Sequence, residues 1–387
     1  MRNFHIYIVF FYSIALTGCN KLSRGNENTL IDGLRLFKTG EYRLEIEKLG
    51  TINFIRHQVF EIKDSTFIFL LNKSINALEI YNLTTEKFAK RINIPKEGPY
   101  AINNPQGFLV ISSDSIFVFP QGHVKNTILI NGKGDVLSHY SPPVPKNDIF
   151  GIVNHKSVPS APSYFLNKRL HFSILPMLDT KVPENINRNI LLASEFEIDN
   201  NTLIFPANMC YPKSYLQKGL ISYHTNFSRI INDRNEWIYS FAGSDSLYIY
   251  DINYILKSQV AAKSKAINNI PKFDRYPGEI NSMEMCIKSG SYGRIIYDKF
   301  KNNYYRIVQL PREYEPNQDY DVNALAKCAF SVIKFDEQFN KISETNFNEK
   351  IYDMNCIFIT NKGLNIPRTN YWNKELTEEV VNIDVFN

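Results

Sequence analysis

The chain has 387 residues, of which 44% are hydrophobic and 13% aromatic, and its formal net charge is +5 at pH 7. This composition supplies a large core and excludes an intrinsically disordered chain. The charge is small for the length and no basic run occurs, so the sequence excludes a nucleic-acid partner.

The N-terminal segment predicts a lipoprotein leader. Arg2 precedes an apolar run from Ile6 to Leu16, which is too short to cross a bilayer core of about 30 Å as a helix. The run ends in Leu16-Thr17-Gly18-Cys19, a lipobox in which Cys19 becomes the lipid-bearing first residue. We therefore expect a signal peptide over residues 1–18 and attachment to a membrane through lipid on Cys19.

The residues after Cys19 bear on location. Residues 19–29 are polar and predict a flexible tether, and residues 30–387 are expected to form a single domain. No Asp follows Cys19, so the signal that retains lipoproteins in the inner membrane is missing, and the acidic cluster of surface-exported lipoproteins is missing too. These features favour the periplasmic face of the outer membrane over the cell surface.

A short pattern recurs along the chain. Three segments share Asp-Ser, one variable residue and then an aromatic-aliphatic-aromatic triplet: Asp64–Phe69, Asp114–Phe119 and Asp245–Tyr250. Asp-Ser favours a tight turn. The strand that follows is apolar on both faces, so we expect both faces to be buried, as in a propeller blade packed between its neighbours.

Four pairs of strand-like segments flank turn-forming residues and predict β-hairpins. In the clearest pair, Thr127–Ile130 and Asp135–Leu137 surround Asn131-Gly132-Lys133-Gly134. The other pairs are Ala77–Tyr81 with Phe88–Ile92, Glu195–Ile198 with Thr202–Phe205, and Ser331–Phe335 with Lys341–Thr345. Such units at a period of about 50 residues predict an all-β fold, a β-propeller of six blades of antiparallel strands, with seven blades or a two-sheet sandwich as alternatives.

Two further segments complete the predicted elements. Tyr42–Ile46 is expected to close the ring by joining the sheet built by the strands near Ile357–Ile366. Helical periodicity is scarce, and Val260–Asn268 is the best segment for a helix.

Besides Cys19, the chain contains Cys210, Cys286, Cys328 and Cys356. An extracytoplasmic compartment permits disulfides, and four cysteines allow three pairings that sequence cannot distinguish. Cys286, Cys328 and Cys356 lie in apolar strand-like segments, which favours buried thiols that act as small hydrophobic groups. The disulfide state is therefore left open.

Three features together resemble an uncharacterised family of Bacteroidetes lipoproteins, the domain-of-unknown-function family 4221. They are the lipobox leader, Ile92–Pro99 at the end of a hairpin, and Ala262–Lys265 after a Tyr-rich strand. The resemblance covers about residues 30 to 370 and implies a six-bladed propeller outside the cytoplasm. It brings no catalytic residue, because the family has no established activity.

The sequence contains no zincin, nucleophile-elbow, P-loop or EF-hand motif. We therefore predict no catalytic residue, no metal and no cofactor, although His155, His171 and His224 could still meet at a propeller axis. Ligands of propellers bind where loops meet at one end of the channel. Seven residues in inter-strand segments are candidate ligand-binding residues: Glu97, Tyr100, Asn208, Tyr211, Arg275, Tyr276 and Arg294.

Arginine and tyrosine together suit a sugar or an acidic peptide. The alternative is that the aromatic rings fill the space between blades and the arginines are solvated. We predict a membrane-tethered binding or interaction module for a glycan, a peptide or an envelope protein, and enzymatic activity is left open. The other candidates are a propeller lyase or glycoside hydrolase, which needs paired carboxylates at the channel mouth, and a structural subunit with a large exposed apolar patch.

Overall fold

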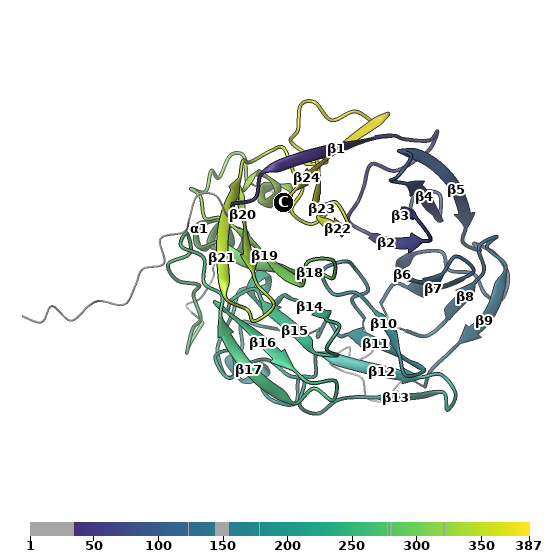
Figure 1. Ribbon diagram of the computed structural model, residues 1–387. Helices are drawn as coiled ribbons and strands as arrows, with labels where there is room; N and C mark the ends of the chain where they lie inside the picture. Colours follow the sequence, from purple (N-terminus) through teal and green to yellow (C-terminus); the bar gives the residue numbers. More distant parts are fainter. Residues whose placement is uncertain are drawn as a thin grey trace, which may run out of the picture.

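The computed structural model describes residues 35–122, 124–143, 155–177, 179–276, 278, 281–319 and 322–387. The described strands form six antiparallel sheets of four strands each, arranged around one axis as a six-bladed β-propeller (Figure 1). The predicted fold is confirmed, with six blades rather than seven. The predicted leader, the tether and Cys19 lie outside the described residues.

Each blade is a four-stranded sheet, and in blades 1 to 5 the strands follow one another in chain order from the axis outward. Blade 1 contains β2 (His57–Ile62), β3 (Ser65–Asn72), β4 (Ala77–Asn82) and β5 (Lys87–Asn93). Blade 2 contains β6 (Pro105–Ser112), β7 (Ser115–Pro120), β8 (Thr127–Ile130) and β9 (Val136–Tyr140). Blade 3 contains β10 (Tyr164–Leu166), β11 (Arg169–Ser173), β12 (Ala193–Glu197) and β13 (Thr202–Ile204).

Blade 4 contains β14 (Phe227–Ile231), β15 (Trp237–Phe241), β16 (Ser246–Tyr250) and β17 (Leu256–Ala261). Blade 5 contains β18 (Ser291–Asp298), β19 (Asn303–Gln309), β20 (Phe330–Phe335) and β21 (Lys341–Phe347). Blade 6 contains β22 (Phe358–Thr360), β23 (Gly363–Pro367), β24 (Val380–Phe386) and β1 (Lys38–Glu45). The described helices are α1 (Ser282–Ser289), η2 (Pro183–Asn185), η3 (Ser222–Thr225) and η4 (Val322–Lys327).

The ring closes in blade 6, where the N-terminal strand β1 lies outside β24 (Figure 1). The register runs from Lys38 opposite Phe386 to Glu45 opposite Val380. The predicted closure is therefore confirmed. Its direct partner is β24, a strand that the sequence patterns did not identify.

All four predicted hairpins are present, as β4–β5, β8–β9, β12–β13 and β20–β21. In the β8–β9 turn the side-chain oxygen of Asn131 accepts from the backbone N–H groups of Lys133 and Asp135. Gly134 has φ of 94°, and a Cβ added there would lie 2.6 Å from the carbonyl oxygen of Asn93 in blade 1. A residue without a side chain is therefore required at this position.

The strands that follow Asp-Ser are buried on both faces, as predicted. Two of them, β3 and β7, are second strands, whereas β16 is the third strand of blade 4. The cores lie between blades, as six clusters of buried side chains. Trp237, Tyr239 and Phe241 of β15, for example, pack against blade 3.

The predicted helix at Val260–Asn268 is wrong. Val260 and Ala261 belong to β17 and pair with Leu247 and Ser246 of β16. The one α-helix among the described residues is α1, which begins after Asn281; the Asn281 side chain accepts from the backbone N–H groups of Met283 and Glu284. No described helix combines the length and apolar character needed to cross a membrane.

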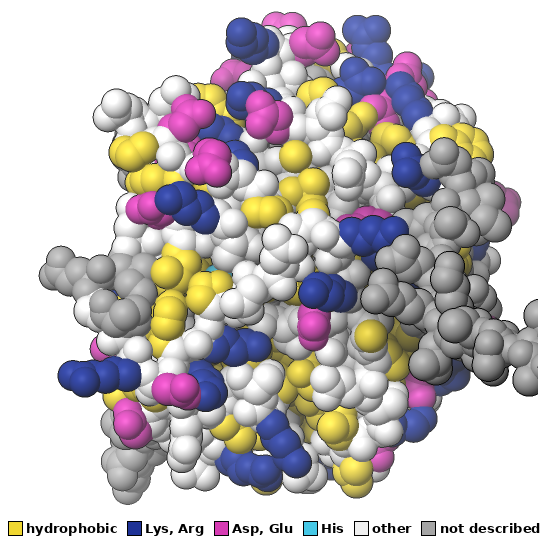
Figure 2. Space-filling view, turned by 90° about the vertical axis from the view of Figure 1, so that its left-hand side faces the viewer, with side chains coloured by type: hydrophobic (Ala, Val, Ile, Leu, Met, Phe, Trp, Pro, Cys, Tyr) yellow, Lys and Arg dark blue, Asp and Glu magenta, His cyan; other side chains and the backbone are white. Residues whose placement is uncertain are grey.

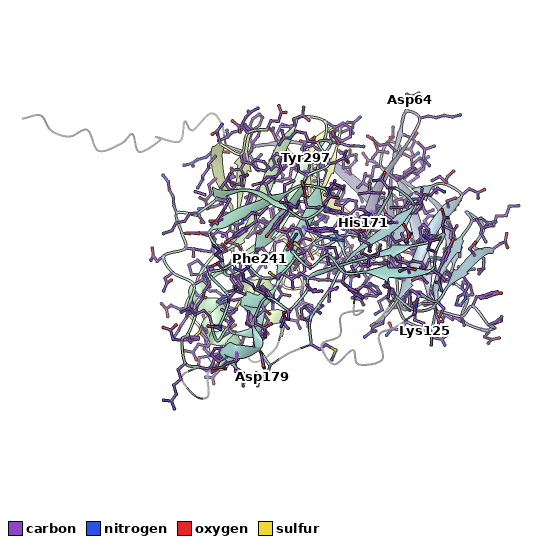
Figure 3. The ribbon with its side chains drawn as sticks, turned by 90° about the horizontal axis from the view of Figure 1, so that it is seen from below. Asp64, Lys125, His171, Asp179, Phe241 and Tyr297 are labelled. Carbon is purple, nitrogen blue, oxygen red and sulfur yellow. The ribbon has the colours of Figure 1, made fainter. Side chains whose placement is uncertain are left out.

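Two ends and a rim define the surface of the propeller. Asp64 and Tyr297 lie at one end, and Lys125 and Asp179 lie at the other (Figure 3). The innermost strands run toward the first end, because Tyr297 is near the end of β18. On the rim that carries β17 and β21, Lys and Arg alternate with Asp and Glu, and hydrophobic side chains are scattered among them (Figure 2).

Candidate functional site

The innermost strands of all six blades line one cavity around the propeller axis, which we call the axial cavity. Each blade contributes at least one residue: Val59 of β2, Phe108 of β6, Tyr164 of β10, Ile231 of β14, Arg294 of β18 and Ile359 of β22. The cavity volume is about 390 Å³, within the range of about 300–1,000 Å³ typical of ligand pockets. The propeller therefore has a channel large enough for a small ligand.

A second cavity, of about 330 Å³, lies where β14 and β18 begin, toward the end of the molecule that carries Asp179. Its walls include Lys156, Ser228 of β14 and Arg294 of β18, and we call it the basic cavity. Arg294 lines both cavities, so its side chain stands at their junction. The two cavities together form the candidate site.

Arg294 reaches across the channel from blade 5 to neighbouring elements. Its Nε donates to the carbonyl oxygen of Pro159, 3.1 Å away, and its Nη1 donates to the carbonyl oxygens of Asn355 and Ile357. Burial lowers the pKa of Arg294 to about 10, so the guanidinium stays charged at neutral pH. It is held by carbonyl dipoles and by no carboxylate among the described residues.

Three more cations line these cavities, and one of them, the exposed Lys299, pairs with Glu61. The other two are Lys156 and Arg56. The Nζ of Lys156 lies 3.5 Å from the carbonyl oxygen of Phe227, and burial lowers the pKa of this lysine to about 8. The Nε of Arg56 donates to the carbonyl oxygen of Gln106 at 2.9 Å, and burial also lowers the pKa of Arg56. Neither cation has a carboxylate partner in the described part of the chain.

His57 stands beside these cations in a neutral form. Burial and the charge of Arg294 lower the pKa of His57 to about 3. Its Nδ1 donates to the carbonyl oxygen of Phe54, and its ring lies 5.5 Å from that of Phe358. His57 therefore fills the channel wall and adds no charge at neutral pH.

A cation withdrawn from water without a counter-ion costs free energy unless something compensates it, and Arg56, Lys156 and Arg294 are each half-buried. Arg56, Lys156 and Arg294 line cavities whose described walls contain a single carboxylate, the exposed Asp233 at one end of the axial cavity. The channel therefore has a positive character that a bound anion would neutralise.

The predicted ligand-binding residues do not share one cavity, and Arg294 is the member of the set that lines the channel. Glu97 and Tyr100 are exposed in the β5–β6 connection, and the Tyr100 ring lies 5.3 Å from His139 of the outermost strand β9. Asn208 is exposed after β13, on the outer side of blade 3. These three residues line neither of the two cavities.

The other members lie between β13 and α1. Tyr211 is buried, stacks on Tyr215 with ring centres 5.5 Å apart, and donates to the carbonyl oxygen of Thr225. Arg275 is exposed, and the half-buried Tyr276 packs its ring against Phe273. Tyr211 therefore fills the space between blades, as the alternative interpretation expected. A binding role for the others stays a prediction and does not involve one common site.

The three histidines also remain apart. His155 contacts the Phe119 and Phe172 rings, His171 contacts Tyr254, and His224 lies 3.2 Å from the carbonyl oxygen of Gly290. Among the described residues, no three His, Cys, Asp or Glu side chains gather as metal ligands would. The four described cysteines are free thiols; Cys286, Cys328 and Cys356 are buried and Cys210 is half-buried.

Sequence reasoning missed Arg56 and Lys156. The Asp-Ser turn at Asp64 joins the innermost strand to the second strand, so the residues one strand upstream line the axis. For the Asp-Ser turns at Asp64 and Asp114, the segment upstream of the turn contributes Arg56–Val59 and Gly107–Leu109 to the axial cavity. Lys156 has no comparable signal, because the short β10 near it carries no motif.

Comparison with known proteins gives the family. The family model for a domain of unknown function, DUF4221, matches residues 53–346. No curated protein matches the sequence. A DUF4221 protein of Bacteroides vulgatus superposes with a TM-score of 0.79 at 20% identity, over 91% of this chain and 98% of that one. A Bacteroides fragilis protein predicted to be exported superposes with a TM-score of 0.56 at 10% identity, over 93% of this chain and 97% of that one.

At these identities the two structures support the propeller fold. The family model covers blades 1 to 4 completely and blade 5 up to Asn346. The chain therefore belongs to the DUF4221 family.

Proposed function

We propose that this protein is a membrane-tethered extracytoplasmic propeller that binds a small ligand in its central channel. The observation that carries the proposal is the axial cavity, to which all six innermost strands contribute. A cavity assembled from every blade is held rigidly by the closed ring, and rigid sites lose little entropy on binding.

The cations support binding of a ligand as the role of this channel. Arg56 and Arg294 are held by backbone carbonyl groups, so their positions are set before any ligand arrives. Fixed guanidinium groups recognise charged or polar ligand groups with geometric selectivity. Guanidinium groups held in fixed positions suit a non-catalytic binding module.

The tether rests on the sequence of the leader. The apolar run Ile6–Leu16 is followed at once by the lipobox ending in Cys19. A mature protein with more than one acyl chain on Cys19 stays bound to a membrane. We place it at the periplasmic face of the outer membrane, because no acidic export cluster follows Cys19.

A cavity-filling variant tests the channel. A thermal-shift screen of glycans, peptides and small metabolites on the full-length protein is expected to yield ligands that raise Tm. Val59 lines the axial cavity, and Val59→Trp is expected to abolish that increase. Leu137→Trp on the exposed side of β9 is the matched control and should keep it. A ligand that stabilises both variants equally would place its site elsewhere.

The tether has its own test. The wild-type protein is expected to sediment with outer membranes and to incorporate an alkyne-labelled fatty acid. Cys19→Ala should lose the label and become soluble after cell disruption. Proteinase K added to intact cells should leave the wild type uncut, whereas digestion would indicate the cell surface. A Cys19→Ala variant that stays in the membrane fraction would contradict lipid anchoring.

A further inference from the structure

We propose that the basic cavity binds the carboxylate group of a small polar ligand, with Lys156 and Arg294 as the two charged contacts. This inference rests on the proposed binding function and names the chemical class of the ligand. It follows from how each cation is bonded, from the composition of the cavity wall and from the cavity size.

Arg294 presents one nitrogen that the protein does not use. Its Nε and Nη1 donate to three backbone carbonyl oxygens, and Nη2 has no hydrogen-bond partner among the described residues. Nη2 is not one of the buried polar atoms that lack a hydrogen-bond partner. It is therefore still accessible from the cavities. The guanidinium group of Arg294 is fixed in place, and the N–H groups of its Nη2 are available to an acceptor.

Arg306 shows what a purely structural arginine looks like in this protein. It is fully buried, and all three of its nitrogens donate, to Ser240 Oγ and to the carbonyl oxygens of Ala262, Phe241 and Ser244. Arg294 differs in having a cavity on each side and a nitrogen without a partner. The difference separates a residue that binds blades together from one that can also bind a ligand.

Lys156 is the second charged contact. Its ammonium group has three N–H donors but makes one long hydrogen bond, of 3.5 Å, to the carbonyl oxygen of Phe227. With a pKa of about 8 it is mostly charged at neutral pH, although burial opposes that charge. A carboxylate beside it would supply both the missing acceptor and the opposite charge.

The rest of the wall fits a small polar carboxylate. Asn226, Ser291, Gln309 and Asn355 supply hydroxyl and amide groups, and the described wall contains no Asp or Glu. At about 330 Å³ the cavity has the size for a sugar acid or a short acidic peptide. Each of these ligands has a carboxylate group.

Phosphate is the less favoured anion. Phosphate sites commonly use free backbone N–H groups at a helix N-terminus. The N-terminal residues of α1, 281–285, do not line the basic cavity. The basic cavity offers two side-chain cations and no residue of the α1 N-terminus.

Calorimetry on the full-length protein in mild detergent at pH 7 tests the inference with four probes. D-glucuronate and N-acetyl-L-glutamate carry the carboxylate, D-glucuronamide is the neutral counterpart of the first, and inorganic phosphate is the competing anion. At least one carboxylate probe is expected to bind at least about tenfold more tightly than glucuronamide and phosphate. Which carboxylate binds distinguishes a sugar acid from an acidic peptide.

Substitutions then locate the site. Lys156→Met and Arg294→Lys are each expected to weaken carboxylate binding about tenfold, and Lys156→Arg should keep most of it. Lys96→Met, on an exposed residue of the β5–β6 connection, changes the net charge equally and should have no effect. Unchanged circular dichroism of the Lys156 variants separates loss of binding from loss of folding.

Three outcomes overturn the inference: no binding of either carboxylate, tighter binding of phosphate, or equal binding by wild type and Lys156→Met. If one of these outcomes occurs while another ligand binds the wild type but not Val59→Trp, the inference fails and the proposed channel function stands. If the ligands found in the screen raise the Tm of Val59→Trp as much as that of the wild type, the proposed channel function fails independently of the inference.

Discussion

The guanidinium carbon of Arg306 lies 3.9 Å from the centre of the Tyr292 ring. Arg306 belongs to β19 and Tyr292 to β18, so the stack lies within blade 5. The hydrogen bonds of Arg306 reach blade 4, at Ser240 of β15 and at Ala262, the residue that follows β17. Arg229 of β14 has a similar role in blade 4, with its guanidinium 4.7 Å from the Trp237 ring and a hydrogen bond to the His171 carbonyl oxygen in blade 3. Buried arginines therefore join successive blades.

Replacing Arg306 is expected to be costly. Arg306→Met removes the donors to four buried acceptors, so we expect the free energy of unfolding to fall by about 3 kcal/mol. Denaturant unfolding followed by fluorescence measures the change. Arg275→Met, on an exposed arginine, should change stability by less than about 0.5 kcal/mol. Equal effects of the two substitutions would show that the bonds of Arg306 contribute little.

Glu236 should make stability depend on acid. Burial by itself would raise the pKa of its carboxylate, but hydrogen bonds from Lys257, Asn232 and Arg234 outweigh burial and lower the pKa to about 2. A lowered folded pKa contributes stability above the unfolded value of about 4.5, and that contribution is lost as pH falls toward 2. We expect Glu236 to contribute about 2 kcal/mol over this window.

Glu236→Gln gives the test. The variant should be less stable than wild type at pH 7, and the gap should close between pH 4.5 and 2 in urea titrations. Glu97→Gln, on an exposed carboxylate, should follow the wild-type curve at every pH. A gap that stays constant down to pH 2 would contradict the assigned pKa.

Lys156 is expected to reduce stability in the absence of ligand. Its folded pKa of about 8 lies below the ordinary value of 10.5, because burial opposes the charge. The unfolded chain then binds more protons between these values, so wild-type stability rises with pH across this window. Lys156→Met should be more stable by about 2 kcal/mol at pH 7, and this advantage should shrink between pH 8 and 10.5. Thermal unfolding at a series of pH values measures it, and a pH-independent difference would contradict it.

The thiols should be slow to react in the folded protein. Burial raises the pKa of Cys286 to about 12 and also raises the pKa of Cys328 and Cys356. Because the thiolate is the reactive form, we expect these three to react with iodoacetamide at least about 100-fold more slowly than in urea. The half-buried Cys210 should react first. Peptide mapping without reductant checks the prediction, and a disulfide-linked pair would contradict it.

Much of the fold could be predicted from local patterns. Asn131 and the glycines that follow it specify the β8–β9 turn through backbone conformation alone, so that hairpin was predictable. The closing strand β24 was missed although residues 381–385 alternate apolar and polar side chains as a strand does, because no turn motif marks it and its partner β1 lies at the other end of the sequence. Asp384 is buried and bonds to Lys38, Tyr352 and Arg368, of which Lys38 belongs to β1 and reaches Asp384 only when the ring is closed.

Radial position was harder to predict than strand order. Second and third strands are both buried on two faces, so the Asp245 copy of the motif looked equivalent to the Asp64 copy although β16 is a third strand. The candidate site suffered from the same ambiguity. Arg294 was identified, but an inter-strand position does not reveal whether a residue faces the axis or the rim, as Tyr100 and Asn208 show.

The closure of blade 6 has a consequence for how the protein folds. Asn387 donates to Thr39, 348 residues earlier, beside the β1–β24 ladder. Hairpins within blades 1 to 5 form from neighbouring residues, but β1 must wait as an unpaired edge until β24 has been synthesised. Contacts of such sequence separation form slowly, and waiting edges are prone to pair with other chains. Ring closure is thus the step at which folding of this protein competes with aggregation.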